Sequence, residues 1–215
     1  MKVYIVGTPF HHYFEEMFSS RGHEIVKTIA EADVVQFTGG EDISPSLYGE
    51  HEHQYSGPNE RRDRLEIAAY EEARELGKFC AGVCRGGQLL NVLSGGSMYQ
   101  HVSSHSSGSG HGAVDVETGD VFPVSSLHHQ MMILGDGGKL LAKSQDVRSK
   151  VKLGMTRLGS KRAEEVVTTD DEVEVEACYY PATRSFCYQP HPEFVTPDHP
   201  CRNYYFKKLE QLLQA

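Results

Sequence analysis

A cysteine stands between two glycines in the stretch FCAGVCRGGQLLN, residues 79–91, where a strand-like run changes into a helix-like run. The pattern around Cys84 is G-x-C-x-G, the cysteine counterpart of the serine nucleophile elbow. In such a turn a Cβ atom two residues to either side would collide, so Gly82 and Gly86 are required. Free backbone N–H groups at a helix start also stabilise a thiolate and can receive an oxyanion. The pattern therefore predicts a nucleophilic thiol, against the alternative of a buried packing cysteine.

A base and an orienting carboxylate follow far downstream, in the stretch QPHPEF at residues 189–194. His191 and Glu193 are two residues apart, so on an extended segment both side chains can face the same side. The carboxylate can then hold one imidazole nitrogen while the other nitrogen faces the thiol. Since the chain holds 12 histidines, a chance H-x-E in a proline-rich surface turn is the alternative.

The overall composition points to a protein that acts on a small molecule. With 215 residues, 39% hydrophobic and 24% charged, the chain can bury a core and is neither disordered nor membrane-embedded. Its net charge of -9 argues against general affinity for nucleic-acid phosphates. The N-terminal stretch MKVYIVGTPFHHYFEE lacks the apolar region and cleavage site of a signal peptide. We expect one domain over residues 1–215, cytoplasmic, with no nucleic-acid or membrane partner.

The cysteines and histidines show no familiar metal-ligand spacing. The five cysteines are odd in number and include no C-x-x-C pair, so they are expected to be reduced. Five histidines are loosely grouped in the middle of the chain: His101, His105, His111, His128 and His129. Because their spacings fit no common pattern and thiol chemistry needs no metal, we expect neither a metal nor a cofactor.

Strand and helix patterns alternate in the first half of the chain. Strand-like runs occupy residues 3–6, 24–27, 33–37 and 78–83, and helical patterns occupy residues 11–20, 61–76 and 85–93. The second helix carries a set of apolar residues on one face, which we expect to be its packing face: Leu65, Ala68, Ala69, Ala73 and Leu76. Alternation of this kind predicts a parallel sheet with the site at the carboxyl ends of its strands.

The second half of the chain has a different character. Runs at residues 113–117, 121–124, 172–179 and 184–189 predict antiparallel strands, and residues 203–213 predict a closing helix. Two segments are expected to be mobile surface loops: residues 103–112, and residues 139–162 with eight Lys or Arg. The predicted fold is α/β, with a flavodoxin-like, mainly parallel sheet flanked by helices and antiparallel additions in the second half.

The sequence resembles the class I glutamine amidotransferases, and among them the γ-glutamyl-γ-aminobutyrate hydrolase group of C26 peptidases. Residues 59–102 match that group's R-D-x-x-E helix, its G-x-C-R-G-x-Q-L-L-N elbow and its G-G-x-x-Y-Q strand. Further matches are FTGGEDISPSLYG at 37–49, VSSLHHQ at 124–130 and QPHPEF at 189–194. The resemblance covers most of the chain except residues 139–164.

This resemblance implies hydrolysis of a small-molecule γ-glutamyl amide, by thioester formation, release of ammonia or an amine, and hydrolysis of the thioester. Cys84 would be the nucleophile, His191 the proton shuttle and Glu193 its orienting partner. Oxyanion N–H groups would come from Gly39 and Gly40 in the glycine loop and from Arg85 in the elbow. The positions that would hold the glutamyl α-amino and α-carboxylate groups are Gln88, Ser126, Leu127 and His128.

The chain departs from the group's pattern at three places. Thr38 stands where proline is frequent, Gly87 where Met or His is commoner, and Ser125 where asparagine is frequent. None of these changes removes a catalytic group. Gly87 is smaller than the usual residue, so we expect it to loosen the pocket wall and leave room for a leaving group larger than ammonia.

Three roles are compatible with these motifs. The first is a stand-alone γ-glutamyl hydrolase, which the lack of a fused synthetase favours. The second is a glutaminase subunit that delivers ammonia to a separate synthetase or modifying enzyme. The third is a catalytically degenerate binding module, against which the intact set of Cys84, His191 and Glu193 argues.

Overall fold

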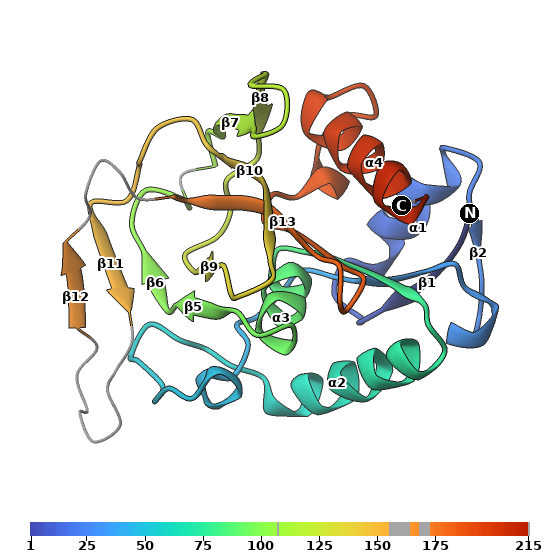
Figure 1. Cartoon of the computed structure of the whole chain (residues 1–215), viewed down its shortest axis with the longest axis horizontal. Coiled ribbons are helices and arrows are strands. Elements are labelled where there is room, and N and C mark those ends of the chain that lie inside the picture. The colour runs from blue at the N-terminus through green and yellow to red at the C-terminus, as the bar shows by residue number, and fades with distance from the viewer. Residues whose placement is uncertain (107, 155–163, 168–172, 215) are drawn as a thin grey trace.

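A mixed β-sheet with helices on both faces forms the fold, as the sequence predicts (Figure 1). The structure is a computed structural model that describes residues 1–106, 108–154, 164–167 and 173–214. Within this part of the chain the main sheet has nine strands in the order β2-β1-β3-β4-β14-β13-β10-β7-β8. The first five in that order are parallel: β2 (Glu24–Ile25), β1 (Lys2–Val6), β3 (Val34–Phe37), β4 (Phe79–Val83) and β14 (Ser185–Tyr188). The antiparallel additions are β13 (Val175–Tyr180), β10 (Lys139–Ser144), β7 (His111–Asp115) and β8 (Val121–Val124).

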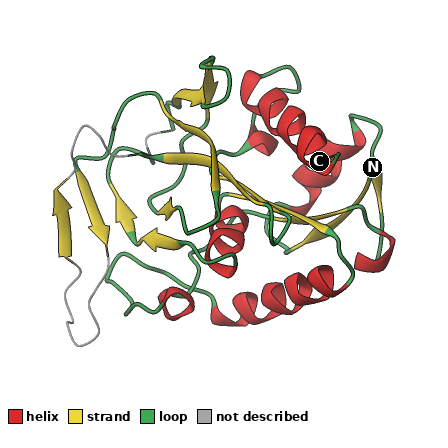
Figure 2. Cartoon of the chain, viewed as in Figure 1, coloured by secondary structure: helices red, strands yellow, loops and turns green. Residues whose placement is uncertain are grey.

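Two small sheets and seven helical segments complete the described structure (Figure 2). One small sheet joins β12 (Glu164–Val167), β11 (Val151–Gly154) and β6 (His101–Val102), and the other joins β5 (Ser97–Tyr99) and β9 (Met131–Ile133). The α-helices are α1 (His11–Ser19), α2 (Glu60–Glu75), α3 (Arg85–Leu93) and α4 (Pro200–Leu213). The 3-10 helices are η1 (Ile29–Glu31), η2 (Pro45–Tyr48) and η3 (Pro192–Phe194). No helix within the described residues combines the length and apolar character that a membrane crossing requires.

Two hydrophobic cores fill the space between the sheet and its helices. On one face Phe14 of α1 and Tyr205 of α4 pack over β1 and β4, and on the other Tyr70 of α2 and Leu89 of α3 pack over β3 and β4. Figure 1 shows the same division, with α1 and α4 on one side of the sheet and α2 and α3 on the other. The central strands are buried on both faces, which explains their continuous apolar runs.

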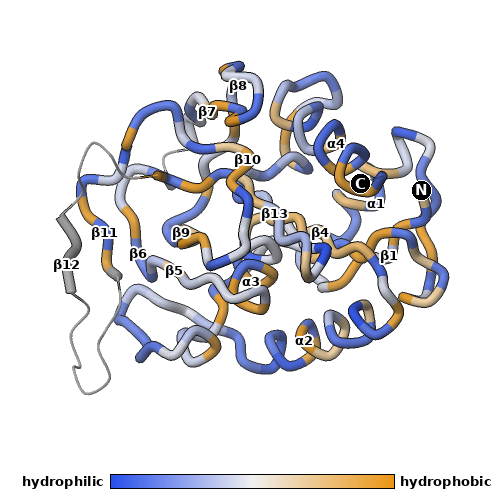
Figure 3. Tube along the Cα trace, in the orientation of Figure 1, coloured by the Kyte–Doolittle hydropathy of each residue, from blue (hydrophilic) through white to orange (hydrophobic). Residues whose placement is uncertain are grey.

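Helix α2 does not bury the face that its apolar residues predict. Leu65 is 64% exposed and Leu76 is 47% exposed, whereas Arg62, Asp63 and Glu66 are buried. Hydrophilic residues dominate this helix in Figure 3. The reason is that α2 faces buried polar partners at the start of α3 and in the loop after β3, so ion pairs rather than apolar area set its rotation.

The basic segment 139–162 is not a surface loop in its described part. Residues 139–144 form β10 and residues 151–154 form β11, while residues 155–162 of that prediction lie outside the described residues. In β10 the side chains of Lys139 and Lys143 are exposed while Ala142 is buried, so the basic residues occupy solvent-facing positions of a strand. The closing helix starts at Pro200, earlier than predicted, because His199 accepts a hydrogen bond from the Cys201 N–H at 3.1 Å and caps it.

Candidate active site

Cys84 occupies the turn between β4 and α3 and has backbone angles φ 49° and ψ -114°. A positive φ is rare for a residue with a side chain, and such strained positions are concentrated at functional sites. A Cβ atom on Gly82 would lie 2.3 Å from the Gly86 carbonyl carbon, and one on Gly86 would lie 2.4 Å from the Phe37 oxygen. The steric prediction for both glycines is therefore confirmed.

His191 and Glu193 reach the same sheet edge because β14 runs parallel to β4. Tyr188 pairs with Val83 in that ladder, so the chain after β14 emerges beside Cys84. The Nδ1 atom of His191 lies 2.6 Å from Glu193 Oε1. The two residues do not share an extended segment as predicted, because Glu193 lies in the 3-10 helix η3, but the turn still brings the carboxylate to the imidazole.

The imidazole of His191 is close to the thiol as well. A Cβ atom on Gly39 would meet His191 Cε1 at 2.8 Å and Cys84 Cβ at 3.6 Å, so the ring and the cysteine flank one glycine. Burial opposes charge on the ring, but the negative charges of Cys84 and Glu193 and hydrogen bonds to both raise the pKa of His191 well above its ordinary value of 6.5. A protonated imidazole beside a sulfur is the arrangement that stabilises a thiolate.

Ser125 holds the backbone of His191, a contact that the sequence reasoning missed. The His191 N–H donates to Ser125 Oγ at 2.7 Å. Ser125 is the residue that replaces the asparagine frequent in similar sequences, and its short hydroxyl side chain makes this contact directly. The signal was present in the sequence as a departure within a matched motif.

The glycine loop after β3 is oriented by Arg62. The guanidinium donates to the carbonyl oxygens of Gly39 at 2.8 Å and Thr38 at 3.1 Å. In a trans peptide the C=O and N–H point in opposite directions, so the Gly40 N–H is directed away from Arg62. Gly40 and Cys84 line the same cavity, which makes this N–H a candidate oxyanion donor. Arg85 is the first residue of α3, where backbone N–H groups have no partner within the helix, and is the second candidate.

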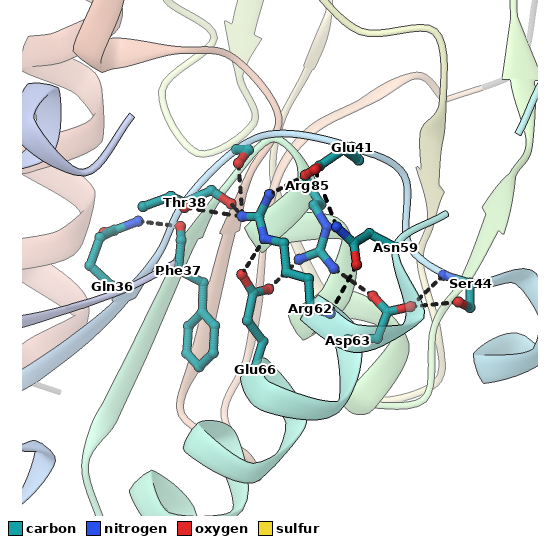
Figure 4. Close-up of polar contacts among 11 residues, drawn as sticks. Gln36, Phe37, Thr38, Glu41, Ser44, Asn59, Arg62, Asp63, Glu66 and Arg85 are labelled. Carbon is teal, nitrogen blue, oxygen red and sulfur yellow. Dashed lines mark hydrogen bonds and ion pairs between the residues drawn. The ribbon is translucent and has the colours of Figure 1, made fainter. Parts of the chain in front are cut away.

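Two arginines and two carboxylates connect α2 to both of these donors (Figure 4). Arg62 pairs with Glu66 at 2.7 Å, and the same carboxylate pairs through its other oxygen with the buried side chain of Arg85. Asp63 also pairs with Arg85 and accepts a hydrogen bond from the Ser44 N–H at 3.0 Å. The R-D-x-x-E motif of the sequence therefore has a positioning role, which its match to the family pattern did not disclose.

We expect Arg62→Lys to lower kcat for the chain's own reaction by up to about 100-fold, because lysine keeps the charge but loses the two-carbonyl contact that orients an oxyanion donor. The matched control is Arg64→Lys on the same helix, where the ion pair with Glu60 is at 3.5 Å and its side chains are 71% and 78% exposed. Steady-state rates and melting temperatures of both variants are the measurement. Equal kcat values for the two variants would contradict the positioning role.

Two cavities meet at the thiol. A cavity of about 480 Å³ is lined by Phe10, Phe194 and His191, and a second cavity of about 330 Å³ is lined by polar groups that include Gln88 and Gln130. The residues that line both are Gly40, Glu41, Cys84 and Leu127. The nucleophile therefore has an aromatic cavity on one side and a polar cavity on the other.

Three of the four predicted substrate-binding residues lie on the polar cavity. Gln88, Leu127 and His128 line it, as do His129 and Asp42, whose side chains pair at 3.2 Å. Ser126 does not line either cavity, because its buried hydroxyl donates to the carbonyl oxygen of His105 at 2.6 Å.

Gly87 does not widen the site, contrary to the sequence prediction. A Cβ atom on Gly87 would lie 3.0 Å from the Tyr188 nitrogen and 3.1 Å from the Gly82 oxygen, so the residue faces the backbone of β14 and β4. It lines neither cavity. Room beside the thiol comes instead from the space bounded by Phe10 and Phe194.

Comparison with known proteins gives the same family and fold. A family model described as Peptidase C26 matches residues 17–193. The glutamine amidotransferase-like protein YvdE homolog of Lactococcus lactis subsp. cremoris is 37% identical over 155 residues, which are 58% of this chain and 82% of that protein. YvdE of Lactococcus lactis subsp. lactis is 34% identical over 164 residues, which are 62% of this chain and 70% of that protein.

Solved structures resemble the chain along its length. PurLQS from Thermotoga maritima has a TM-score of 0.67 at 16% identity, over 99% of this chain and 98% of that chain. A glutamine amidotransferase from Thermotoga maritima has a TM-score of 0.59 at 15% identity, over 98% of this chain and 84% of that chain. At these identities the likeness is one of fold alone.

Proposed function

The chain belongs to the peptidase C26 family, an enzyme family of the glutamine amidotransferase class, and we propose that it hydrolyses γ-glutamyl amide bonds with Cys84 as nucleophile. The observation that carries the proposal is the placement of an imidazole, held by Glu193 at 2.6 Å, beside a thiol on a strained turn. The charge on His191 gives the thiolate its counter-ion and provides the proton that the leaving amine needs.

The first half of the proposed reaction forms a thioester. The Cys84 sulfur attacks the γ-carbonyl carbon, and the carbonyl oxygen receives hydrogen bonds from the N–H groups of Gly40 and Arg85. His191 then gives its Nε2 proton to the amide nitrogen, the C–N bond breaks, and ammonia or an amine leaves. A γ-glutamyl thioester and a neutral imidazole remain, with Glu193 still fixing the ring through Nδ1.

The second half hydrolyses the thioester. Neutral His191 accepts a proton from a water molecule, and the resulting hydroxide oxygen attacks the thioester carbon. The C–S bond breaks, glutamate leaves, and the sulfur and the protonated ring return to their starting states. One water is consumed for each amide bond, so no cofactor takes part in the balance.

The two cavities support an assignment of the substrate's halves. The glutamyl α-amino and α-carboxylate groups need polar partners, which Gln88, His128 and Gln130 supply on the smaller cavity. The leaving amine would then occupy the larger cavity, between Phe10 and Phe194, whose rings pack edge to face at 5.1 Å. An aromatic space of this size accommodates more than ammonia, which supports γ-glutamyl amines as substrates.

A second candidate function is a glutaminase subunit that passes ammonia to a separate synthetase. The observation in its favour is the fold likeness to PurLQS, a TM-score of 0.67 over 98% of that chain. In this case glutamine would bind the same polar cavity, and the partner would cover the aromatic one. The third candidate, a binding module without turnover, would need Cys84 for binding rather than for bond cleavage.

Glutamate release separates the first two candidates. We expect γ-glutamyl benzylamide and other γ-glutamyl amines to be hydrolysed faster than glutamine, so that the ratio of their kcat/KM values exceeds one. The purified protein is assayed alone and with cell extract of its native source. A ratio below one, with glutamine turnover rising many-fold in extract, would contradict the hydrolase and favour the glutaminase subunit.

Phe10→Ala gives the same experiment a structural readout. We expect kcat/KM for γ-glutamyl benzylamide to fall about 10-fold, because an apolar contact in a pocket changes discrimination by about 1 to 3 kcal/mol, while the value for glutamine changes little. Tyr13→Ala is the matched control, since Tyr13 also packs on Phe194, at 5.2 Å, but does not line the cavity. Equal effects of Phe10→Ala on both substrates would place the leaving group elsewhere.

A further inference from the structure

A buried cluster of two histidines and a glutamate lies outside the proposed catalytic groups. His105, on the loop before β7, His111, at the start of β7, and Glu176, on β13, each offer one ligand atom within 4.8 Å of the other two. The exposed fractions of the three side chains are 0%, 2% and 0%. Their rings and carboxylate come from segments far apart in sequence, so the spacing of the histidines alone could not indicate the cluster.

Hydrogen bonds fix which nitrogen of His105 carries a lone pair. Burial opposes charge on Glu174, but hydrogen bonds from His105 and from the N–H groups of Arg148 and Ser149 lower its pKa to about 2, so it is a carboxylate. A carboxylate only accepts, so the Nε2 of His105, at 3.0 Å, must donate to it. The Nδ1 of His105 therefore carries a lone pair, and it has no hydrogen-bond partner among the described residues.

Further acceptors in the cluster are also unpaired. Glu176 Oε1 lies 2.7 Å from His111 Nε2, but Glu176 Oε2 and His111 Nδ1 have no partner in the part of the chain that the structure describes. A buried carboxylate oxygen and buried imidazole nitrogens without partners cost free energy, because each has lost its water. A cation that coordinates them removes this cost, whereas two isolated His–Glu pairs leave it in place.

We propose that His105, His111 and Glu176 bind a divalent transition-metal ion of the Zn²⁺ type. Two imidazole nitrogens and one carboxylate oxygen form a ligand set that such ions favour and that Mg²⁺ and Ca²⁺, which prefer oxygen, do not. Glu174 completes the arrangement, since it accepts from the far nitrogen of His105 as carboxylates do behind metal-bound histidines. His128, whose ring packs on that of His105 at 4.7 Å, is a candidate for a fourth ligand.

The tautomer of His128 suits that position. Its Nδ1 lies 2.8 Å from the Gln130 carbonyl oxygen and must donate to it, so its Nε2 holds a lone pair, which has no partner within the described residues. Burial holds the pKa of His128 well below its ordinary value, so the ring is neutral and available for coordination.

A metal here would stabilise the wall of the polar cavity. The carbonyl oxygen of His105 accepts from Ser126 Oγ at 2.6 Å and from the His128 N–H at 3.2 Å. The carbonyl oxygen of Glu176 accepts from the Gln189 N–H at 2.8 Å, two residues before His191. An ion bound to His105 and Glu176 would therefore fix the segments that carry His128 and His191 relative to each other.

Metal binding is tested in a Cys84→Ala background, because the thiol would itself bind zinc. The protein is stripped with a chelator, loaded with ZnSO₄ and desalted, and bound zinc is measured by mass spectrometry of the metal. We expect one zinc per chain. Glu176→Gln and His111→Ala should weaken zinc binding by more than the roughly 10- to 100-fold expected for Glu174→Gln, which acts through His105. His129→Ala, which removes the separate pair with Asp42, should bind zinc as the parent does.

Co²⁺ provides a measurement that does not depend on whether these variants fold. Cobalt bound to the Cys84→Ala protein should give the visible absorption of a four- or five-coordinate nitrogen and oxygen site without a sulfur charge-transfer band, and zinc should displace it in a one-to-one ratio. Failure of the Cys84→Ala protein to retain zinc would overturn the proposal. So would equal zinc binding by Glu176→Gln and the parent, or loss of zinc in His129→Ala.

Discussion

Replacing Cys84 with alanine is expected to lower kcat for γ-glutamyl amide hydrolysis by at least about 10⁴-fold, because no other group nearby can form the thioester. The residue lines both cavities although it is only 7% exposed, so the loss concerns chemistry and not access. Cys80→Ala is the matched control, since Cys80 lies four residues earlier on β4 and is fully buried. Retention of activity by Cys84→Ala would contradict the mechanism.

Alkylation of the wild-type protein should single out the same residue. Burial raises the pKa of Cys80 to about 12 and that of Cys201 to about 11, so neither forms a reactive thiolate at neutral pH. Loss of activity should therefore follow modification of the peptide that contains Cys84, as mapped by mass spectrometry. Inactivation with Cys84 unmodified would point to a different nucleophile.

His191→Ala is expected to be as damaging as Cys84→Ala, whereas Glu193→Ala should retain partial activity. Removing the imidazole deletes both the proton donor of the first step and the base of the second. Removing the carboxylate, which lies 2.6 Å from Nδ1, misplaces the ring and lowers its charge without deleting it. The measurement is kcat for each variant on one γ-glutamyl amine.

A double variant shows whether the thiol and the imidazole act as a unit. We expect Cys84→Ala combined with His191→Ala to be little worse than either single change, because the second deletion removes a partner that no longer has a role. Rate losses that multiply would mean that the two residues contribute independently, which the shared hydrogen bond and charge interaction between them do not allow.

The sequence predicted the parts of the site that depend on local chemistry. The elbow glycines, the parallel order of β3, β4 and β14, and the meeting of Cys84 with His191 follow from turn sterics and from strands that end at one sheet edge. These features need no knowledge of how distant surfaces pack.

The features that the sequence did not predict depend on partners far along the chain. The buried face of α2 is set by ion pairs with Arg85 and by the carbonyl of Gly39, so an apolar pattern around Leu65 gave the wrong rotation. Gly87 faces the backbone of β14, which only the packed helix reveals. Likewise, His105 and Glu176 are 71 positions apart in the chain and meet only through the antiparallel part of the sheet.

The partition of a shared intermediate is the most direct test of γ-glutamyl transfer through Cys84. The protein is incubated with several γ-glutamyl amides that differ in leaving amine, each in the presence of hydroxylamine, and the ratio of γ-glutamyl hydroxamate to glutamate is measured. If every substrate passes through the same γ-glutamyl thioester, the ratio is the same for all of them, because the amine has left before the nucleophile arrives. A ratio that changes with the leaving amine would show direct attack on the substrate and contradict the thioester.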